Sequence, residues 1–197
     1  AVTFVSCMLL RIMALPNLKL RPVAETDAGA IRKVVIDGCV DPAVALWVDV
    51  RWQSVDAFVA SICRDFAWKL IAEQQGDVVG FVACGQDEAI GGVSAVMVRP
   101  DRQRWGVGKM LMEAIISRLY EAGVRFMEAT IPEDVSGGCA LFRGFQFREV
   151  SRSVCLSNAV GSGVVVLKES DGVVRKYLES GYCKKGLWVH FERRWRY

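Results

Sequence analysis

The stretch VMVRPDRQRWGVGKMLMEAI, residues Val96–Ile115, carries the clearest structural signal in the chain. Its first residues are apolar and predict a strand, which Pro100 ends because proline has no amide hydrogen for a strand ladder. Gly106 and Gly108 follow a run of arginines and precede apolar residues at helical spacing. The stretch therefore predicts a strand, a cationic glycine turn and a helix in direct succession.

Such a turn is suited to binding an anion. The amides that open a helix have no internal acceptors, and aligned peptide dipoles add partial positive charge there. Arg102, Arg104 and Lys109 would add more positive charge, so a phosphate or pyrophosphate is the favoured guest. Two other phosphate motifs fit less well, because the chain has neither a G-x-x-x-x-G-K-[ST] pattern nor the third glycine of a dinucleotide fingerprint.

The composition of the 197-residue chain is that of one globular domain. Hydrophobic residues make up 52%, which is enough for a substantial core. The formal net charge is +3, and residues of both signs are well mixed along the chain. This mixing argues against a nucleic-acid partner, which would favour a clustered basic surface.

Cysteine and histidine usage argues against a disulfide framework and against a metal site. The seven cysteines are odd in number, scattered and without a C-x-x-C pair, so we expect reduced thiols in a cytoplasmic protein. The single histidine, His190, cannot form a metal cluster alone and is expected as an ordinary surface or strand residue. The cysteines are Cys7, Cys39, Cys63, Cys84, Cys139, Cys155 and Cys183.

Three segments are expected along the chain. Residues 1–16 are apolar but short and interrupted by Arg11, which fits neither a membrane span nor a signal peptide, so no membrane partner is expected. We interpret them as an N-terminal extension, and the residues before Met13 as upstream of a self-sufficient start. Residues 17–156 are expected to form the main domain, and residues 157–197 a strand and helix segment that completes or extends its sheet.

The periodicity of the chain predicts strands and helices in an α+β order. Beyond residue 156, 163–169 and 187–195 are strand-like and 173–181 is helix-like. The expected sheet is mostly antiparallel. Its strands are predicted at 18–23, in a hairpin over 68–85, and at 93–98, 124–131 and 145–156, with 86–92 as a loop. Helices are predicted from a cap at Thr26 or Asp27 to Gly38, from a Ser54 cap to 66, from the glycine turn to Gly123, and over 133–144.

The run VMVRPDRQRWGVGKMLM closely resembles the acetyl-coenzyme A binding motif of the GNAT acetyltransferase superfamily. That motif reads Gln or Arg, two residues, Gly, one residue, then Gly or Ala, and Gln103, Gly106 and Gly108 fill it. The resemblance extends from about Leu18 to Phe147. It implies a GNAT-like mixed, mostly antiparallel central sheet flanked by helices, with a C-terminal extension.

The resemblance implies acetyl-CoA as the cosubstrate and no metal. The turn would surround the pyrophosphate with main-chain amides, and Met97 and Val98 would pair with the pantetheine arm as an added strand does. The residues that the resemblance assigns to the turn are Gln103, Arg104, Trp105, Gly106, Val107, Gly108 and Lys109.

The resemblance also implies a reaction cleft where strands 93–98 and 124–131 splay apart, often at a bulge. Positioning of the thioester and the amine would supply much of the rate, and a strand amide near Val98 would stabilise the carbonyl oxygen as it gains charge. The amine must lose a proton, so a carboxylate or a water chain should act as base. Glu128 is the first candidate and Glu88 the second.

The general acid departs from the family pattern. Family members carry a tyrosine in a segment like A-x-x-F-Y-x-x-x-G-F, and here that place holds Phe142, with Gln146 in place of the glycine. A phenyl ring cannot donate a proton, which leaves solvent, Cys139 or Ser136 as donors. A thiol has a pKa of roughly 8.5, so its thiolate can also leave without full protonation.

The leading interpretation is an N-acetyltransferase that moves an acetyl group from acetyl-CoA to a primary amine of a small molecule or a protein in a ternary complex. The alternative is a coenzyme A sensing or interaction module with weak or no transfer, whose aromatic tail LWVHFERRWRY docks on a partner. A longer acyl group and a homodimer also stay open. The acceptor side is expected between Val40 and Phe66, where Trp47 and Trp52 are candidates for a pocket wall.

Overall fold

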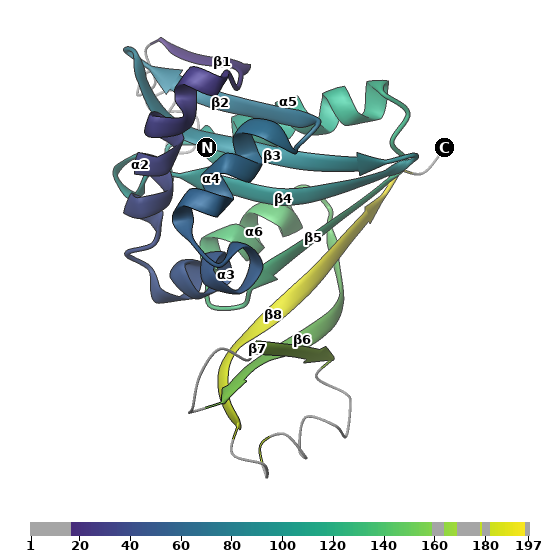
Figure 1. Ribbon diagram of the computed structural model, residues 1–197. Coiled ribbons are helices and arrows are strands. Elements are labelled where there is room, and N and C mark those ends of the chain that lie inside the picture. The colour runs from purple at the N-terminus through teal and green to yellow at the C-terminus, as the bar shows by residue number, and fades with distance from the viewer. Residues whose placement is uncertain (1–16, 159–163, 169–177, 179–181, 196–197) are drawn as a thin grey trace, which may run out of the picture.

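The computed structural model describes residues 17–158, 164–168, 178 and 182–195. Among these residues, the centre is an eight-stranded sheet in the order β1-β2-β3-β4-β5-β8-β6-β7, and β4 with β5 is its parallel pair (Figure 1). The expected α+β class with a mostly antiparallel sheet is confirmed. The strands are β1 (Leu18–Pro22), β2 (Trp68–Gln74), β3 (Asp77–Asp87), β4 (Ile90–Val98), β5 (Phe126–Pro132), β6 (Arg148–Asn158), β7 (Val164–Lys168) and β8 (Tyr182–Arg194).

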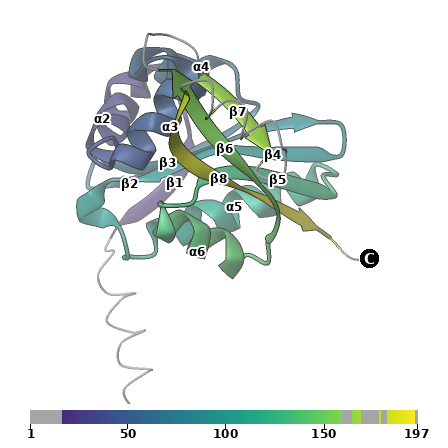
Figure 2. The same ribbon diagram turned by 90° about the horizontal axis from the view of Figure 1, so that it is seen from below.

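Helices cover both faces of the sheet, which gives three layers (Figure 2). One face, the α2–α4 face, carries three helices, and the other, the α5–α6 face, carries two. No helix in the described part of the chain is both long and apolar enough to cross a lipid bilayer. The elements are α2 (Ala28–Gly38), α3 (Pro42–Trp52), α4 (Val55–Arg64), α5 (Val107–Glu121) and α6 (Ser136–Gly144), with short 3-10 turns at Glu25–Asp27 and Pro100–Arg102.

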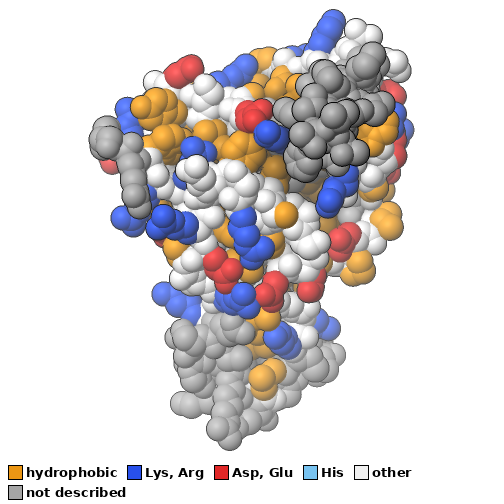
Figure 3. Space-filling view, turned by 180° about the vertical axis from the view of Figure 1, so that it is seen from behind, with side chains coloured by type: hydrophobic (Ala, Val, Ile, Leu, Met, Phe, Trp, Pro, Cys, Tyr) orange, Lys and Arg blue, Asp and Glu red, His pale blue; other side chains and the backbone are white. Residues whose placement is uncertain are grey.

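Two apolar cores separate the layers. Leu111 and Ile115 of α5 are fully buried against the sheet on the α5–α6 face, and Phe58 of α4 packs near Phe81 of β3 on the other face. Burial of each such side chain contributes about 1.5–3 kcal/mol to stability. Figure 3 shows the α5–α6 face, where hydrophobic side chains gather across the upper part and Lys, Arg, Asp and Glu side chains are mixed lower down.

The predicted helix caps are partly confirmed. Ser54 Oγ accepts a hydrogen bond from the amide of Ala57 at 3.1 Å, as expected. Asp27 stands at the start of α2 but does not cap it, because its carboxylate accepts two hydrogen bonds from Arg21, at 2.7 and 2.8 Å, and one from the amide of Ala24. The Arg21 guanidinium lowers the pKa of Asp27 and joins β1 to the start of the helical layer.

The expected loop at 86–92 is instead a tight hairpin. Strand β3 extends to Asp87 and β4 begins at Ile90, so two residues connect them, and Glu88 of this turn has φ 48°. Glycines in this segment suggest a loop in the sequence, but Gly91 lies within the ladder. A β-carbon there would come within 3.2 Å of the Val124 side chain, so the strand passes close to the end of α5.

Helix α3 is not among the expected elements. Its residues PAVALWVDVRW are apolar almost throughout, so hydrophobic periodicity is a weak signal. The sequence does hold a start signal, because Asp41 Oδ1 accepts a hydrogen bond from Ala43 N at 2.9 Å and Pro42 opens the helix. Asp41 and Pro42 are therefore the sequence signals that could have predicted α3.

The C-terminal segment enters the interior of the sheet. Strand β8 lies between β5 and β6, and Trp188 and Phe191 are 5% and 1% exposed. Trp195 packs on Tyr120, with ring centres 5.6 Å apart. The interpretation that this tail docks on a partner is therefore wrong for its described residues, because Trp188, Phe191 and Trp195 pack within the protein itself. The helix-like stretch 173–181 lies outside the described residues, apart from Leu178.

Candidate active site

The parallel strands β4 and β5 separate part of the way along their length. Their ladder ends at the pair Val93 and Ala129, although β4 continues to Val98 and β5 to Pro132. The gap between the strands therefore opens toward the end of β4 that leads into the glycine turn. This is the separation that the resemblance implies.

A bulge in β4 accompanies the separation. The pairing with β3 skips Ser94, so this residue is extra on β4. The alternation of side chains reverses there, because Val93 faces the α5–α6 core whereas Ala95 and Met97 face the α2–α4 core. A bulge bends the strand that carries it, and this one lies beside the last pair shared with β5.

Beyond the bulge, alternate residues of β4 direct their main-chain groups into the gap. Arg99 N donates to Val79 O at 2.9 Å, and hydrogen-bonded pairs alternate along an antiparallel ladder. Met97 therefore directs its amide and carbonyl toward β3, and Val96 and Val98 direct theirs toward the gap. Val96 is not among the residues predicted from the sequence. The register with β3 decides which of two neighbouring strand residues directs its main-chain groups into the gap, and the register is not visible in the sequence.

The glycine turn opens α5 without a side-chain cap. Gly106 is the residue before the helix and has φ 92°, a left-handed conformation that other residues adopt at a cost. The first bond within the helix runs from Met110 N to Gly106 O at 3.0 Å. The amides of Val107, Gly108 and Lys109 therefore have no acceptor within the helix and can bind an anion.

Two contacts hold the turn against the end of β4. The Gln103 side-chain amide donates to Val98 O at 3.1 Å. A β-carbon on Gly108 would lie 3.6 Å from Val98 and 3.5 Å from Leu141, so the first turn of α5 packs closely on the strand. The free amides and the open edge of β4 are thus neighbours.

The arginines of the turn differ in how free they are to bind an anion. Asp101 pairs with Arg99 at 2.8 Å and with Arg102 at 3.0 Å, and Arg102 also stacks on Trp105, 5.2 Å from the ring centre. Arg104 is exposed, has φ 66° and forms no ion pair with any described residue. Lys109, the third predicted cation, lies 3.6 Å from a carboxylate oxygen of Glu113, so Arg104 is the predicted cation without a carboxylate partner among the described residues.

Glu128 lies where β4 and β5 part, on the α2–α4 face. It pairs with Gly92 one position before the ladder ends. Its neighbours Met127 and Ala129 face the α5–α6 core, so alternation directs Glu128 to the other face, where it is exposed. A carboxylate at this point can take a proton from an amine in the gap.

A row of polar side chains crosses three strands beside Glu128. Thr130 Oγ1 lies 3.0 Å from His190 Nδ1, and Ser153 Oγ lies 2.6 Å from His190 Nε2. Burial lowers the pKa of His190, and Arg51 acts in the same direction while Glu128 opposes them. His190 is a strand residue, as expected, but its place beside Glu128 could not be seen in the sequence.

Glu88, the second candidate base, lies at the tight turn between β3 and β4. This turn is at the closed end of β4, where the ladder with β5 begins, and β5 starts beside it with Arg125 N donating to Ala89 O at 2.8 Å. The structure therefore separates Glu88 from the gap and brings Glu128 to it.

A family model, described as the acetyltransferase (GNAT) family, matches residues 45–147, just over half of the chain. The chain belongs to the GNAT acetyltransferase family. The matched segment contains the open edge of β4, the glycine turn and Glu128. No curated protein matches the sequence.

Solved structures of N-acetyltransferases share the fold of this acetyltransferase. The ribosomal-protein-S18-alanine N-acetyltransferase from Escherichia coli has a TM-score of 0.59 at 15% identity, covering 90% of this chain and 93% of that one. The PaiA N-acetyltransferase from Thermoplasma acidophilum, in complex with coenzyme A, has a TM-score of 0.64 at 11% identity, covering 91% and 100%. The ribosomal-protein-alanine N-acetyltransferase from Brucella melitensis has a TM-score of 0.61 at 20% identity, covering 90% and 100%.

The position of the family's tyrosine lies in the apolar core of the acetyltransferase. Phe142 is 2% exposed, with ring centres 5.0 Å from Phe147 and 6.0 Å from Phe191. Cys139 is also buried, and burial raises the pKa of its thiol. Ser136 is exposed at the start of α6. The described part of the chain holds no group of three or more candidate metal ligands.

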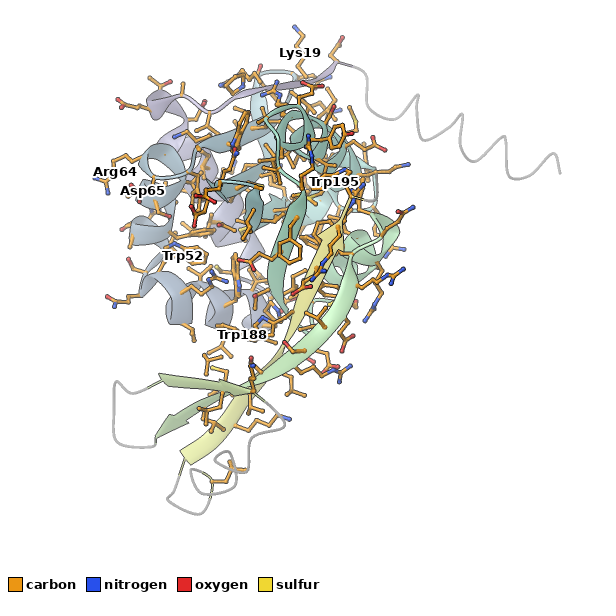
Figure 4. All side chains as sticks on the ribbon, turned by 90° about the vertical axis from the view of Figure 1, so that its right-hand side faces the viewer. Lys19, Trp52, Arg64, Asp65, Trp188 and Trp195 are labelled. Carbon is orange, nitrogen blue, oxygen red and sulfur yellow. The ribbon has the colours of Figure 1, made fainter. Side chains whose placement is uncertain are left out.

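The two tryptophans predicted for an acceptor pocket form an aromatic cluster. Trp47 lies 4.9 Å from Trp52 and 5.6 Å from Phe58 between ring centres, and Trp47 is 8% exposed. Most of their surface therefore packs α3 against α4. Trp52 and Trp188, labelled in Figure 4, both belong to the core under the α2–α4 helices.

Proposed function

We propose that the acetyltransferase moves an acetyl group from acetyl-CoA to a primary amine by direct attack in a ternary complex. The main observation behind the proposal is that two features lie next to each other. The gap between β4 and β5 opens beside the main-chain amides at the start of α5 that have no acceptor within the helix. Family membership supports the donor, and a protein of the same fold, PaiA, is in complex with coenzyme A.

The donor would lie along β4 and end at the glycine turn. Its pyrophosphate would accept hydrogen bonds from the amides that open α5, with Arg104 supplying positive charge. Its pantetheine arm would pair with the main-chain groups of Val96 and Val98, which the register favours over Met97. Gln103, Trp105 and Gly106 would shape the turn around it.

The reaction needs one base and a site for the oxyanion. Glu128 would take a proton from the amine, directly or through water, and the nitrogen would then attack the thioester carbon. The C–N bond forms as the C–S bond breaks, which leaves an amide and the coenzyme A thiolate. A main-chain amide of Val96 or Val98 would stabilise the carbonyl oxygen as it gains charge.

The thiolate would leave without a phenolic acid. Phe142 has no proton to give, and the buried Cys139 thiol is itself a weaker acid than usual. A coenzyme A thiol with a pKa of roughly 8.5 can depart as thiolate and gain its proton from solvent. Solvent is therefore our proposed proton donor.

Thiol release tests this function. The protein is mixed with acetyl-CoA and a panel of primary amines, and we expect thiol only when a suitable amine is present. Glu128→Gln should lower kcat by about 10²–10³ and leave coenzyme A binding unchanged, since the residue acts on the amine. Glu88→Gln is measured in parallel, and a loss of kcat in this variant alone would assign the base to Glu88.

The second candidate function is coenzyme A binding without efficient transfer. The observation that favours it is Phe142 in place of the family's tyrosine. The same experiment separates the two functions, because a protein that binds coenzyme A but releases no thiol with any amine would support the second and exclude the first.

A further inference from the structure

Arg51 is a cation without a counter-charge in contact. It lies in the last turn of α3 and forms no ion pair or hydrogen bond with any described residue. Arg32 and Arg102, by contrast, form ion pairs at 2.8 and 3.0 Å. The Arg51 guanidinium carbon lies 5.3 Å from the centre of the Trp52 ring, which holds it by stacking.

Arg51 is exposed and has protein close to it. Nearby protein lowers the pKa of Arg51 by desolvation, while the charge of Glu128 raises it. Because the guanidinium reaches solvent and contacts no carboxylate of a described residue, an anionic ligand can bind it with charge-assisted hydrogen bonds.

Arg51 on α3 and Glu128 on β5 are both exposed, and both elements meet on the α2–α4 face. Both side chains act on the pKa of His190, in opposite directions, which agrees with a shared region between α3 and the β5–β8 pair. Helix α3 packs on β5, and Leu46 comes within 3.5 Å of a β-carbon placed on Gly186 of β8. A pocket of about 130 Å³ continues this seam and is lined by Leu46, Pro132 and Trp188, among others.

Arg51 would lie too far from the phosphates of the donor to bind them. They would lie at the glycine turn, beyond Val98, whereas Glu128 and Arg51 lie near the last ladder pair at Val93. Val98 lies five positions beyond Val93 along the strand, which corresponds to roughly 16 Å. Arg51 is therefore on the acceptor side of the reaction centre.

We propose that Arg51 binds a carboxylate of the acceptor, and that the acceptor is a small amine that also carries a carboxylate, such as an amino acid. The assignment rests on the proposed function and names the class of its acceptor. A zwitterion matches both charges of the site, with its ammonium beside Glu128 and its carboxylate on Arg51. The guanidinium can donate two parallel hydrogen bonds to that carboxylate.

Two unused donors lie in the same layer. The indole Nε1 atoms of Trp47 and Trp188 are buried and have no hydrogen-bond partner among the described residues. Trp47 precedes Arg51 by one helical turn on α3, and Trp188 lies two residues from His190 on β8.

Matched acceptors test the proposal. Thiol release is measured with amino acids and with their carboxamides, which keep the amine and lose the carboxylate. We expect kcat/KM to be at least about tenfold higher for the acids, because charge-assisted hydrogen bonds of this kind are strong. Arg51→Gln should lower kcat/KM for the acids by about 10–100-fold, mainly through KM, and leave the carboxamides unchanged. Arg51→Lys should restore part of the loss, since it keeps the charge without the planar fork.

The control is Arg64→Gln, which removes the same charge. Arg64 is exposed in the last turn of α4, on the outer side of the helices in Figure 4, and forms no ion pair with any described residue. This variant should keep the preference for acids. Equal activity with acids and carboxamides in the wild-type protein, or an equal loss for both in Arg51→Gln, would overturn the proposal.

A binding measurement separates this proposal from the proposed function. Amino acids are titrated into protein saturated with coenzyme A, and tryptophan fluorescence reports binding without any transfer. Binding that depends on Arg51 while no amine releases thiol would support the carboxylate site and refute the transfer. Transfer to amines without a preference for those that carry a carboxylate would support the transfer and refute the carboxylate site. Better transfer to peptides than to amino acids would exclude a small-molecule acceptor.

Discussion

His190 shows how the site determines the state of one residue. Its two ring nitrogens lie within hydrogen-bond distance of Thr130 and Ser153, at 3.0 and 2.6 Å. A neutral imidazole has one donor and one acceptor, so one hydroxyl donates to the ring and the other accepts from it. Burial first, and Arg51 second, lower the pKa of His190, and Glu128 offsets part of their effect. The surroundings of His190 therefore favour its neutral form.

Acid should destabilise the protein through this residue. A histidine in the unfolded chain titrates near pH 6.5, and the pKa of folded His190 is lower, so below about pH 6.5 the unfolded state binds the extra proton. The free energy of unfolding should then decrease as pH falls from about 6.5 until the folded residue is also protonated. Urea unfolding at a series of pH values measures this decrease.

The chain has a single histidine, which makes the control direct. His190→Gln should remove the decrease between about pH 6.5 and 5, the range above the ordinary carboxylate pKa values. If the variant kept the same slope, carboxylates and not His190 would be responsible for it.

The ends of α5 and α6 use one capping geometry with two different residues. Gly123 follows α5 at φ 91°, and Val124 N donates back to Leu119 O at 2.9 Å. Gln146 takes the same place after α6 at φ 64°. Both are Schellman-type ends, in which a left-handed residue lets the chain close the last turn. The family pattern has glycine where this chain has Gln146, and the left-handed conformation of this position explains the preference for glycine.

Gln146→Gly should therefore stabilise the protein. Removal of the β-carbon relieves the left-handed strain of about 1 kcal/mol, although the greater freedom of glycine in the unfolded chain offsets part of it. We expect a net gain of roughly 0.5 kcal/mol in the free energy of unfolding, measured in urea. Gly123→Ala is the reciprocal variant and should lose about 1 kcal/mol. A destabilised Gln146→Gly would mean that the glutamine side chain makes a compensating contact.

The whole molecule depends on its last strand. Strand β8 pairs with β5 on one edge and with β6 on the other, so it joins the active-site half of the sheet to the arm formed by β6 and β7 (Figure 1). Its side chains enter both cores, with Val189 on the α5–α6 face and Trp188 on the α2–α4 face. Strand β8 therefore contributes to both cores and holds the two parts of the sheet together.

Deletion of the residues after Gly186 should prevent folding. The deletion removes the buried residues of β8 and exposes an edge of β5, so we expect loss of the cooperative urea transition and of coenzyme A binding. Deletion of residues 196–197 alone leaves β8 complete and should preserve both. A shortened chain that ended at Gly186 and still unfolded cooperatively would show that β8 is dispensable.

The donor half of the site could be predicted because its signals are local. Pro100, Gly106 and Gly123 mark a strand end, a turn and a helix end within one short stretch, and backbone preferences of single residues suffice to place them. Glu128 followed from the resemblance, and Phe142 was visible as a departure from it. Helix α3 and the tight hairpin at Glu88 were missed, because an apolar helix lacks periodicity and glycines within a strand suggest a loop.

The proposed acceptor half of the site depends on the tertiary structure. Arg51, Glu128 and His190 come from α3, β5 and β8, and the pairing of β5 with β8 and the packing of α3 on β5 bring them to one face of the sheet. The choice of Val96 over Met97 likewise depends on the register with β3. By itself the sequence predicted where a phosphate would bind, since that prediction needs only consecutive residues in one turn. The charges around the amine needed the folded sheet, because no short segment of the chain contains more than one of them.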